Sequence, residues 1–207
     1  MLTIYGKDSS INVRKVLWAC AELGIDYARQ DWGAGFRSTR EPSFLAMNPN
    51  AMVPVIDDGG FVLWESNSIL RYLAGQYGDG SLYPAPPRER ARIDQWMDWQ
   101  ASDLNRAWSY AFMSLVRKSP AHGDAQQVAS SLESWSGFMR VLEQQLRQTG
   151  AFVAGPAFTL ADIPVGLSLV RWFATPFARP ELPAVAAYCD LLETREGYRR
   201  FGRNGMA

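Results

Sequence analysis

Two short sets of polar residues in the first third of the chain have side chains that could bind and activate a ligand. Ser9, Ser10 and Asn12 precede one apolar helical pattern, and Glu65 and Ser66 precede another. Hydroxyl and amide side chains at a helix N-terminus either cap the free helix N–H groups or hydrogen-bond a bound anion, which the helix dipole also stabilises. The sequence leaves both interpretations open. An acid beside such a hydroxyl, as at Glu65, could also hold a ligand that carries an ammonium and a carboxylate on adjacent atoms.

A third feature lies between these groups, where Pro54 follows Val53 at the entry to a strand-like run. Proline cannot donate a hydrogen bond to a strand ladder, so this position belongs at a sheet edge or at the start of a strand. Only about 5–6% of such residue pairs have a cis bond, so the residues alone do not predict one.

The residue inventory excludes several kinds of site. The single histidine, His122, lies in a loop-like stretch, and no nucleophile-elbow motif accompanies it, so a Ser-His-Asp triad is not indicated. A phosphate-binding loop and the dinucleotide Gly-x-Gly-x-x-Gly motif are both absent from the sequence. Cys20 and Cys189 are too few and too far apart for a disulfide framework or a metal site. We therefore expect no bound metal.

Charge and hydropathy exclude two classes of partner. Lys plus Arg and Asp plus Glu number 21 each, so the formal net charge is zero and the basic excess of nucleic-acid-binding proteins is missing. No apolar run approaches the roughly 18 residues of a membrane span. Lys7 follows a short apolar run, which is the reverse of a signal peptide. We expect a cytoplasmic protein that binds neither nucleic acid nor membrane.

The elements that must position these residues alternate between strand-like and helical patterns over residues 1–80. The order read from apolar spacing and turn residues is β-α-β-α-β-β-α. The predicted segments are a strand at Leu2–Tyr5, a helix after Ser10 that ends at Gly24, a strand at Ile25–Asp31, a short helix at Pro42–Met47, two strands at Val53–Ile56 and Phe61–Leu63, and a helix from Glu65.

The proline-rich stretch Pro84–Pro87 separates this half from a helical one. Residues 81–87 form the predicted linker, since proline removes backbone donors and disfavours helix. From residue 88 to 207 only helices are predicted, over about 88–116, 126–148, from near 159, and 183–192. The sequence thus predicts a small α/β domain over residues 1–80 and an all-α domain over residues 88–207.

Order and spacing of the polar groups resemble those of the soluble glutathione transferases, in particular bacterial serine-type or theta-like members. The resemblance extends over the whole chain and rests on four segments: Ser10–Lys15, Asn48–Pro54, Leu63–Leu73 and Phe158–Ile163. It implies a thioredoxin-like N-terminal domain, an all-α C-terminal domain and glutathione as co-substrate. It also implies a homodimer.

The resemblance assigns glutathione-binding roles to five residues. Val53 would pair its main chain with the cysteinyl unit, beside a cis bond at Pro54, and backbone pairing of this kind provides affinity. Ser66 would bind the γ-glutamyl carboxylate and Glu65 the neighbouring ammonium. Met52 stands where many relatives carry a basic or polar residue that holds the glycyl end. Because Met52 supplies no charge, Arg37 or Arg40 could compensate.

The resemblance implies that a hydroxyl group near the first helix activates the glutathione thiol. A free thiol has a pKa near 8.5, and a hydroxyl donor at a helix N-terminus stabilises the thiolate and lowers that pKa. By resemblance we expect Ser10 to donate, with Asn12 as a second donor. Ser9 is the alternative if the double serine follows the zeta class. Tyr5 is the rival from the tyrosine-type classes, but its place in the first strand favours a core position.

The resemblance favours conjugation of glutathione to small hydrophobic electrophiles. A glutathione-dependent isomerase of the maleylacetoacetate type and a non-catalytic binding protein are the alternatives. Trp108, Phe112 and Trp172 are candidates for the electrophile pocket, although aromatic residues at helical spacing also build cores. Thr159–Asp162 is typical of a capping box, so Asp162 is assigned to folding.

Overall fold

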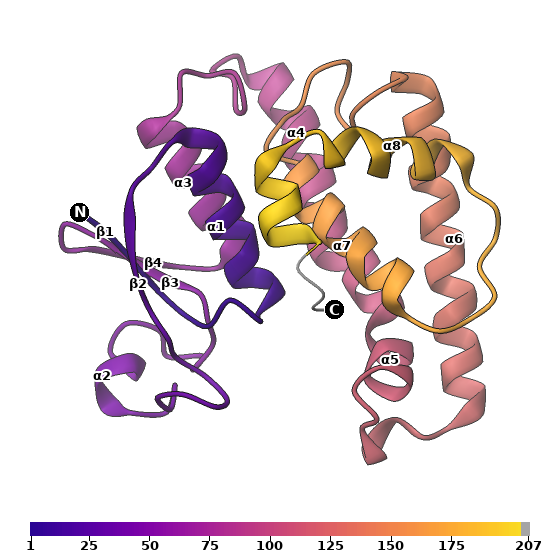
Figure 1. The fold of residues 1–207 in the computed structure, drawn as a ribbon, viewed down its shortest axis with the longest axis horizontal. Helices are drawn as coiled ribbons and strands as arrows, with labels where there is room; N and C mark the ends of the chain where they lie inside the picture. The colour runs from indigo at the N-terminus through magenta and orange to yellow at the C-terminus, as the bar shows by residue number, and fades with distance from the viewer. Residues whose placement is uncertain (204–207) are drawn as a thin grey trace. The chain divides into compact units, whose positions relative to one another are not determined.

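The computed structural model describes residues 1–203 of the 207-residue chain. The chain divides into two compact units, and Figure 1 shows the elements of each. One unit comprises residues 1–83 together with the described residues from Glu196 onward, and the other comprises Pro84–Arg195. The last four residues of the predicted helical domain lie outside the described part of the chain.

The first unit is built on a four-stranded mixed sheet with strand order β2-β1-β3-β4. Strands β1 (Leu2–Tyr5) and β2 (Tyr27–Gln30) are parallel, whereas β3 (Val55–Asp58) runs antiparallel to β1 and to β4 (Phe61–Trp64). A parallel pair needs a crossover connection, and the helix between β1 and β2 supplies it. The predicted element order is confirmed.

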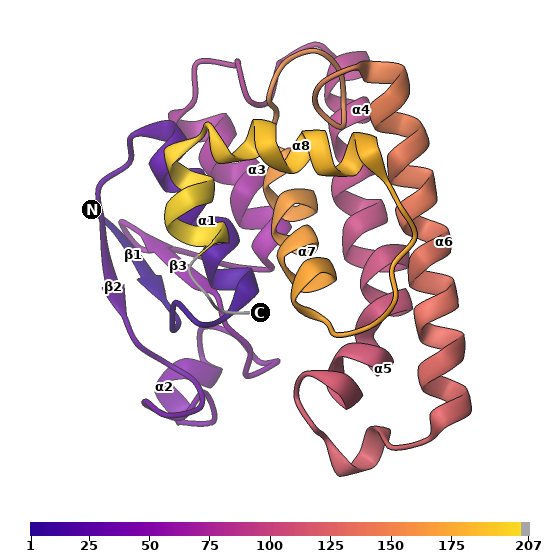
Figure 2. The ribbon, with the colours of Figure 1, turned by 45° about the vertical axis from the view of Figure 1, so that its right-hand side comes forward.

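Two of the three helices of this unit, α1 (Ile11–Leu23) and α3 (Ser66–Tyr77), lie side by side (Figures 1 and 2). Their buried apolar residues form the contact, and Gly24 ends α1 in the left-handed conformation, as predicted. The short helix α2 (Pro42–Leu45) is anchored separately, because its Phe44 packs with Trp32 and Val55. The thioredoxin-like arrangement follows from these contacts.

Helices form the second unit. They are α4 (Pro87–Trp99), α5 (Asn105–Leu115), α6 (Ala125–Thr149), α7 (Asp162–Ala174) and α8 (Pro183–Glu193), with a short 3₁₀ turn at Pro120–His122. The structure differs from the predicted uninterrupted helix over 88–116, because Gln100–Leu104 form a π-helical turn between α4 and α5. Buried Gln100 donates from that turn to Asn105 Oδ1 and to the Ser168 hydroxyl, both at 2.9 Å. No apolar periodicity signals such a polar interaction.

The core of the second unit is aromatic. Trp135 is fully buried, and its ring lies 5.0 Å from that of Trp172 and 5.8 Å from that of Phe177. The buried carboxylate of Glu143 on α6 accepts hydrogen bonds from the N–H groups of Ala184 and Val185, so it caps the start of α8. Local patterning could not predict this cap, since 41 residues separate Glu143 from Ala184.

The last described residues return to the first unit. The π-helical turn Tyr198–Gly202 packs on α1, where the rings of Trp18 and Tyr198 lie 5.3 Å apart and Arg14 donates to the Phe201 carbonyl. A Cβ atom on Gly197 would lie only 2.2 Å from Trp18 Cδ1, so this approach requires glycine. The sequence-based division assigned these residues to the helical domain.

None of the helices within residues 1–203 is long and apolar enough to cross a membrane.

Candidate functional site

The loop from β1 to α1 places Ser10 at the N-cap position of α1 with its hydroxyl unused. The backbone of Ser10 is extended, with φ −81° and ψ 123°, yet its side chain makes no capping hydrogen bond. Within residues 1–203 the hydroxyl groups of Ser9 and Ser10 have no hydrogen-bond partner. Capping therefore does not account for Ser10, and its hydroxyl is available to donate to an anion at the positive end of α1.

Asn12 and Ser66 meet although they belong to different helices. The Ser66 hydroxyl donates to Asn12 Oδ1 over 3.4 Å, and Ser66 is only 7% exposed. Because Ser66 is the first residue of α3 and Asn12 the second of α1, the contact joins two helix N-termini. The positive ends of two helix dipoles meet here, which is an arrangement suited to anionic groups of a ligand.

Glu65 precedes Ser66 in a backbone conformation that is rare for residues other than glycine. Its φ is 71° and its ψ 111°, and its side chain makes no cap for α3. The α3 hydrogen-bond series starts from it, since the Ile69 N–H donates to the Glu65 carbonyl. The exposed carboxylate thus remains accessible beside the buried Ser66 hydroxyl. Such non-glycine outliers cluster at ligand sites, where surrounding contacts hold them.

The peptide bond between Val53 and Pro54 is cis, as the resemblance implied. Val53 lies before β3, which starts at Val55 rather than at the predicted Val53. Within the described residues the main-chain N–H and carbonyl of Val53 have no partner. A free donor and a free acceptor on one residue are what main-chain pairing with an extended peptide requires.

Gly6 brings the serine loop against Val53. Its φ of 149° is unfavourable for other residues, and a Cβ atom there would lie 2.6 Å from Val13 Cγ2 and 3.0 Å from Val53 Cβ. In the sequence, Gly6 only follows the predicted strand Leu2–Tyr5. The sequence did not predict this close approach, which depends on tertiary packing.

Asn48 hydrogen-bonds within the loop that contains Met52 and Val53, a role that the sequence did not predict. Buried Asn48 donates to the Met52 carbonyl over 2.8 Å, and its Oδ1 accepts from both the N–H and the side chain of Asn50. The signal was present, because Asn48 opens the segment Asn48–Pro54 on which the family resemblance rests.

Met52 is 62% exposed and uncharged. A ligand carboxylate at this position would therefore need a cation from another residue. Arg37 is already engaged, because its guanidinium lies 3.9 Å from the Trp32 ring centroid and donates to Glu41 over 2.8 Å. The guanidinium of Arg40 has no partner among residues 1–203. Of the two arginines suggested from the sequence, Arg40 is the one without a competing contact.

Tyr5, the rival thiol activator, packs beside the Trp32, Phe44 and Val55 cluster. This environment is that of a half-buried core residue, as its strand position indicated.

The three candidates for the electrophile pocket lie in the second unit and are all buried, with Trp108 the most exposed at 8%. Trp108 and Phe112 on α5 pack edge to face, with ring centroids 5.4 Å apart, and the guanidinium of Arg171 lies 4.4 Å and 4.6 Å from their rings. Trp172 is 1% exposed between Trp135 and Phe177. Phe112, at 2% exposed, and Trp172 therefore both have almost no surface to offer a ligand, and the contacts of Trp172 are those of the core.

Asp162 has the structural contacts expected from its motif. One carboxylate oxygen accepts from the N–H and hydroxyl of Thr159, and the other accepts from the Val153 N–H and the Tyr188 hydroxyl. The side chain is fully buried. The bond from the Thr159 N–H is one half of the predicted capping box. The other half is not formed, because the Thr159 hydroxyl donates to Asp162 instead of capping α7, whose N-cap position is Ala161. The bonds to Val153 and Tyr188 connect Asp162 to two further segments.

Comparison with known proteins identifies the family. Residues 1–75 match the family model of the glutathione S-transferase N-terminal domain. Glutathione S-transferase GstB of Escherichia coli K12 is 33% identical over 202 residues, which cover 97% of each chain. The chain belongs to the glutathione S-transferase family. Its thioredoxin-like domain and helical unit are the expected fold, and the family resemblance drawn from the sequence is confirmed.

Solved glutathione S-transferases have the same architecture. The theta class enzyme from Xanthomonas axonopodis pv. citri, crystallised with glutathione bound, superimposes with a TM-score of 0.91 at 38% identity, covering 100% of this chain and 99% of that one. Glutathione transferase E6 from Drosophila melanogaster gives 0.83 at 26% identity, with coverage of 100% and 93%. The likeness spans both units of this transferase.

Proposed function

We propose that this transferase binds glutathione in its first unit and conjugates the thiolate to small hydrophobic electrophiles. In the reaction the thiol loses its proton, sulfur attacks the electrophilic carbon, and a leaving group departs with its bonding electrons. In an addition, the electrons move instead onto the acceptor. The observation that carries the proposal is the free Ser10 hydroxyl at the N-terminus of α1.

In the proposed binding mode, separate residues bind the cysteinyl unit and the γ-glutamyl unit of glutathione. The unpaired main chain of Val53 would pair with the cysteinyl unit. On binding, the single hydroxyl proton of Ser66 would turn from Asn12 Oδ1 to the γ-glutamyl carboxylate at the start of α3, and the exposed Glu65 carboxylate would hold the ammonium. Ser10, with Asn12 as second donor, would stabilise the thiolate.

Calorimetry with glutathione, followed by turnover of a panel of halonitrobenzenes, epoxides and enones, tests this function. We expect saturable binding at millimolar glutathione or below and turnover of at least one electrophile class. Absence of both heat and thermal shift would contradict the proposal. Binding without any turnover would favour the non-catalytic alternative.

One observation supports the alternative that the protein is a glutathione-dependent isomerase, namely that Ser9 and Ser10 are adjacent. In a glutathione-dependent cis–trans isomerisation, the thiolate adds to the substrate and is then eliminated, so glutathione is not consumed. Measurement of glutathione during turnover of a cis-enone substrate therefore separates the two reactions. Stoichiometric loss of the thiol indicates conjugation.

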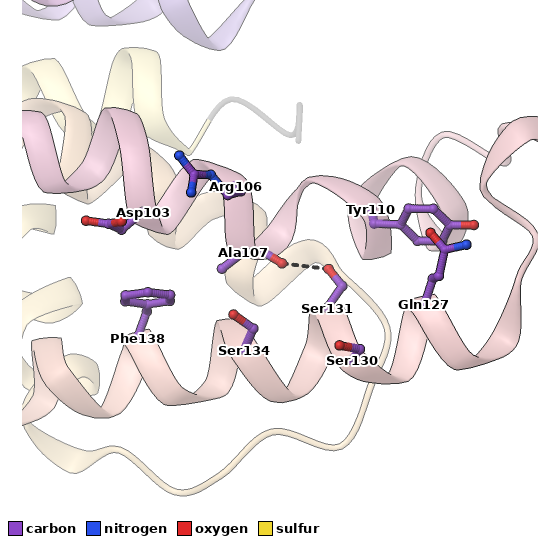
Figure 3. A pocket seen from close by; sticks show the side chains of 9 residues that line it. All are labelled: Asp103, Arg106, Ala107, Tyr110, Gln127, Ser130, Ser131, Ser134 and Phe138. Atoms are coloured by element: carbon purple, nitrogen blue, oxygen red, sulfur yellow. Dashed lines mark hydrogen bonds between the residues drawn. The ribbon is translucent and has the colours of Figure 1, made fainter.

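We also propose that the transferase is a homodimer, with a groove on the second unit as part of the interface. The groove has a volume of about 450 Å³ and lies between the α5 segment and α6 (Figure 3). Asp103 and Arg106 line one wall, Ser134 and Phe138 the other.

Charge complementarity supports a second copy as the occupant of this groove. Asp103 and Arg106 are exposed, lie three positions apart and have no partner within residues 1–203. A two-fold interface uses the same surface of both copies, so every contact occurs twice. Asp103 of each copy can therefore pair with Arg106 of the other.

Light scattering at micromolar concentration tests this interface. We expect about twice the 23.2 kDa chain mass for the wild type. Arg106→Asp should weaken the dimer, because two acids would then face two acids. The double variant Asp103→Arg, Arg106→Asp should restore it. A monomeric wild type, or an Arg106→Asp variant that stays dimeric at every concentration, would contradict the proposal.

A cytoplasmic location is proposed as well, since Cys20 and Cys189 form no disulfide within residues 1–203. Disulfides are rare in that reducing compartment, where glutathione keeps thiols reduced.

A further inference from the structure

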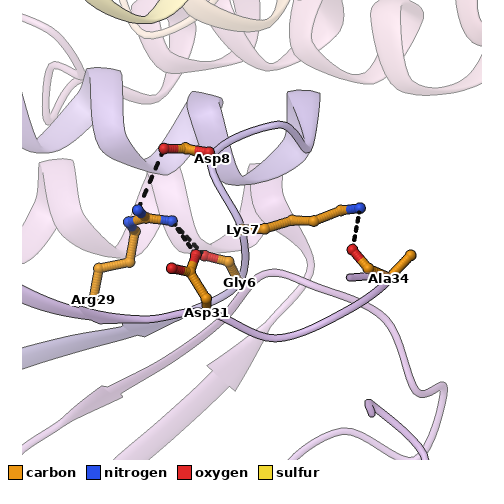
Figure 4. A network of polar contacts seen from close by, with 6 residues as sticks. All are labelled: Gly6, Lys7, Asp8, Arg29, Asp31 and Ala34. Atoms are coloured by element: carbon orange, nitrogen blue, oxygen red, sulfur yellow. Dashed lines mark hydrogen bonds and ion pairs between the residues drawn. The ribbon is translucent and has the colours of Figure 1, made fainter. Parts of the chain in front are cut away.

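The side chain of Arg29, from outside the loop, holds Gly6 and Asp8, which precede Ser9 and Ser10 (Figure 4). Arg29 on β2 donates through Nη1 to the Gly6 carbonyl over 3.3 Å and through Nη2 to the Asp8 carboxylate, also over 3.3 Å. The same guanidinium binds Asp31 over 2.5 Å. One side chain therefore connects the first residues of the loop to the end of β2.

The main chain of this loop provides few bonds of its own. Gly6 and Lys7 donate to the carbonyls of Gln30 and Trp32, and Ser10 donates to the Lys7 carbonyl. The N–H groups of Asp8 and Ser9 have no main-chain partner among residues 1–203. The Ser10 carbonyl accepts from the Arg14 N–H of α1. Since the two serine hydroxyls are unbonded, their positions depend on this bond and on where Gly6–Asp8 are held.

Arg29 is suited to this task by its shape. Its planar fork of five N–H donors can serve three acceptors at once, whereas a lysine ammonium acts as a point charge. The Arg29 side chain is 26% exposed, and Asp31 is 34% exposed, so the pair is partly shielded from water. On the other side of the loop, Lys7 donates through Nζ to the Ala34 carbonyl over 2.9 Å.

We propose that Arg29 is a positioning residue for thiol activation: by holding Gly6 and Asp8 it sets where the Ser10 hydroxyl meets the glutathione sulfur. The inference rests on the proposed function. Arg29 acts through the loop. Glu65 and Ser66, proposed to anchor the γ-glutamyl unit, lie outside that loop, whereas Val53 meets it only at Gly6. Loss of Arg29 should therefore affect thiolate stabilisation much more than glutathione affinity.

The experiment compares wild type, Arg29→Met and Arg29→Lys by titration of the bound thiolate absorbance and by saturation kinetics. For Arg29→Met we expect kcat to fall by about 10- to 100-fold, since misplacement by about 1 Å can cost that much. The pKa of the bound thiol should rise by roughly one unit. KM for glutathione should stay within about threefold, because ground-state binding is retained.

Arg29→Lys separates positioning from charge. Lysine keeps the positive charge but lacks the planar fork that spans the three acceptors, so most of the Arg29→Met defect should remain. A lysine variant with wild-type thiol pKa and kcat would show that charge alone matters, and would overturn the inference.

Two further variants test whether the Arg29→Met effect is only a loss of stability. Arg147→Met removes an arginine that also pairs with a carboxylate, Glu143, but on α6. It should lower the melting temperature without moving the bound thiol pKa. Asp8→Asn keeps Arg29 and its bond to Gly6, and should raise the thiol pKa by a smaller amount in the same direction.

The outcomes distinguish this inference from the proposed function. A wild-type protein with no thiolate band and no turnover would refute the function itself. A wild type with both, together with an Arg29→Met variant that matches it, would refute only the role of Arg29. If Arg29→Met does not fold, Asp8→Asn decides, and a wild-type thiol pKa in that variant would overturn the inference.

Discussion

The hydroxyl of Ser66 donates to Oδ1 of Asn12 over 3.4 Å, although 54 residues separate the two in the sequence. This contact joins the first turns of α3 and α1, the helices assigned to the γ-glutamyl carboxylate and to the thiolate. A ligand whose anionic groups are spaced to meet both helix N-termini would be favoured by both dipoles. The two helix ends are proposed to bind separate groups of glutathione.

Ser66→Ala should weaken glutathione binding by about 1.5–3 kcal/mol, the value of a hydrogen bond to a charged group. Turnover at saturating glutathione should change much less, because the thiolate donor is elsewhere. Calorimetry and saturation kinetics measure the two effects. Ser68→Ala is the matched control, since Ser68 is exposed on the same first turn of α3. Equal losses of affinity in both variants would argue against the carboxylate contact.

The sequence was sufficient for the order of elements and for the family, because apolar spacing and turn residues are local signals. It could not decide between cap and ligand at Ser10, since that depends on where the hydroxyl is left after folding. Nor could it predict the contact of Gly6 with Val53 or the three acceptors of Arg29. Each joins segments far apart in the chain, and no periodicity in one segment records its partner in another.

Aromatic spacing was similarly ambiguous in the second unit. Trp108, Phe112 and Trp172 all follow helical periodicity, yet Trp172 alone packs against both Trp135 and Phe177. Which aromatic faces a ligand and which faces the core is set by the neighbouring helices, so spacing alone could not separate them.

Asp162→Ala should destabilise the fold by at least about 3 kcal/mol, because each buried donor left without an acceptor costs about 1–3 kcal/mol. Four donors lose their acceptor in this variant. Tyr188→Phe removes one of these hydrogen bonds and should cost about 1 kcal/mol. Denaturant unfolding measures both. Activity per folded molecule should be unchanged, and lost turnover with wild-type stability would place Asp162 in the chemistry instead.

Glu143→Gln should alter how stability depends on acid pH. Burial opposes ionisation of Glu143, but Arg147 and the N–H groups of Val185 and Ala184 outweigh it and hold the pKa of this carboxyl below its usual 4.5. The unfolded state therefore binds the proton more readily, so the stabilisation is fully present above the unfolded value and is lost as the pH falls through the lower folded value.

Urea unfolding from pH 7 to pH 3 should accordingly show a smaller acid loss for Glu143→Gln than for wild type. Glu133→Gln is the control on the same helix, because Glu133 is exposed and has no partner among residues 1–203. A Glu143→Gln variant with the wild-type slope below pH 5 would contradict the assignment.

The two cysteines should differ in reactivity. Burial raises the pKa of Cys20 to about 12, and its side chain is fully buried in α1, whereas Cys189 on α8 is partly exposed. Because the thiolate is the reactive form, an alkylating reagent at pH 8 should modify Cys189 and leave Cys20 intact in the folded protein. Mass spectrometry of native Cys189→Ser should show no rapid adduct. A fast adduct on Cys20 would mean that α1 opens readily.

The pKa of the glutathione thiol in the binary complex tests the central claim most directly, since thiolate stabilisation by Ser10 is the proposed source of activity. Thiolate absorbance titrated against pH for wild type, Ser10→Ala and Ser9→Ala gives this value. We expect a bound pKa well below the usual value near 8.5 in wild type and in Ser9→Ala. In Ser10→Ala it should rise, and neutral-pH turnover should fall by up to about 100-fold and partly recover at high pH. A wild-type thiol pKa in Ser10→Ala, with the shift appearing in Ser9→Ala instead, would contradict the account.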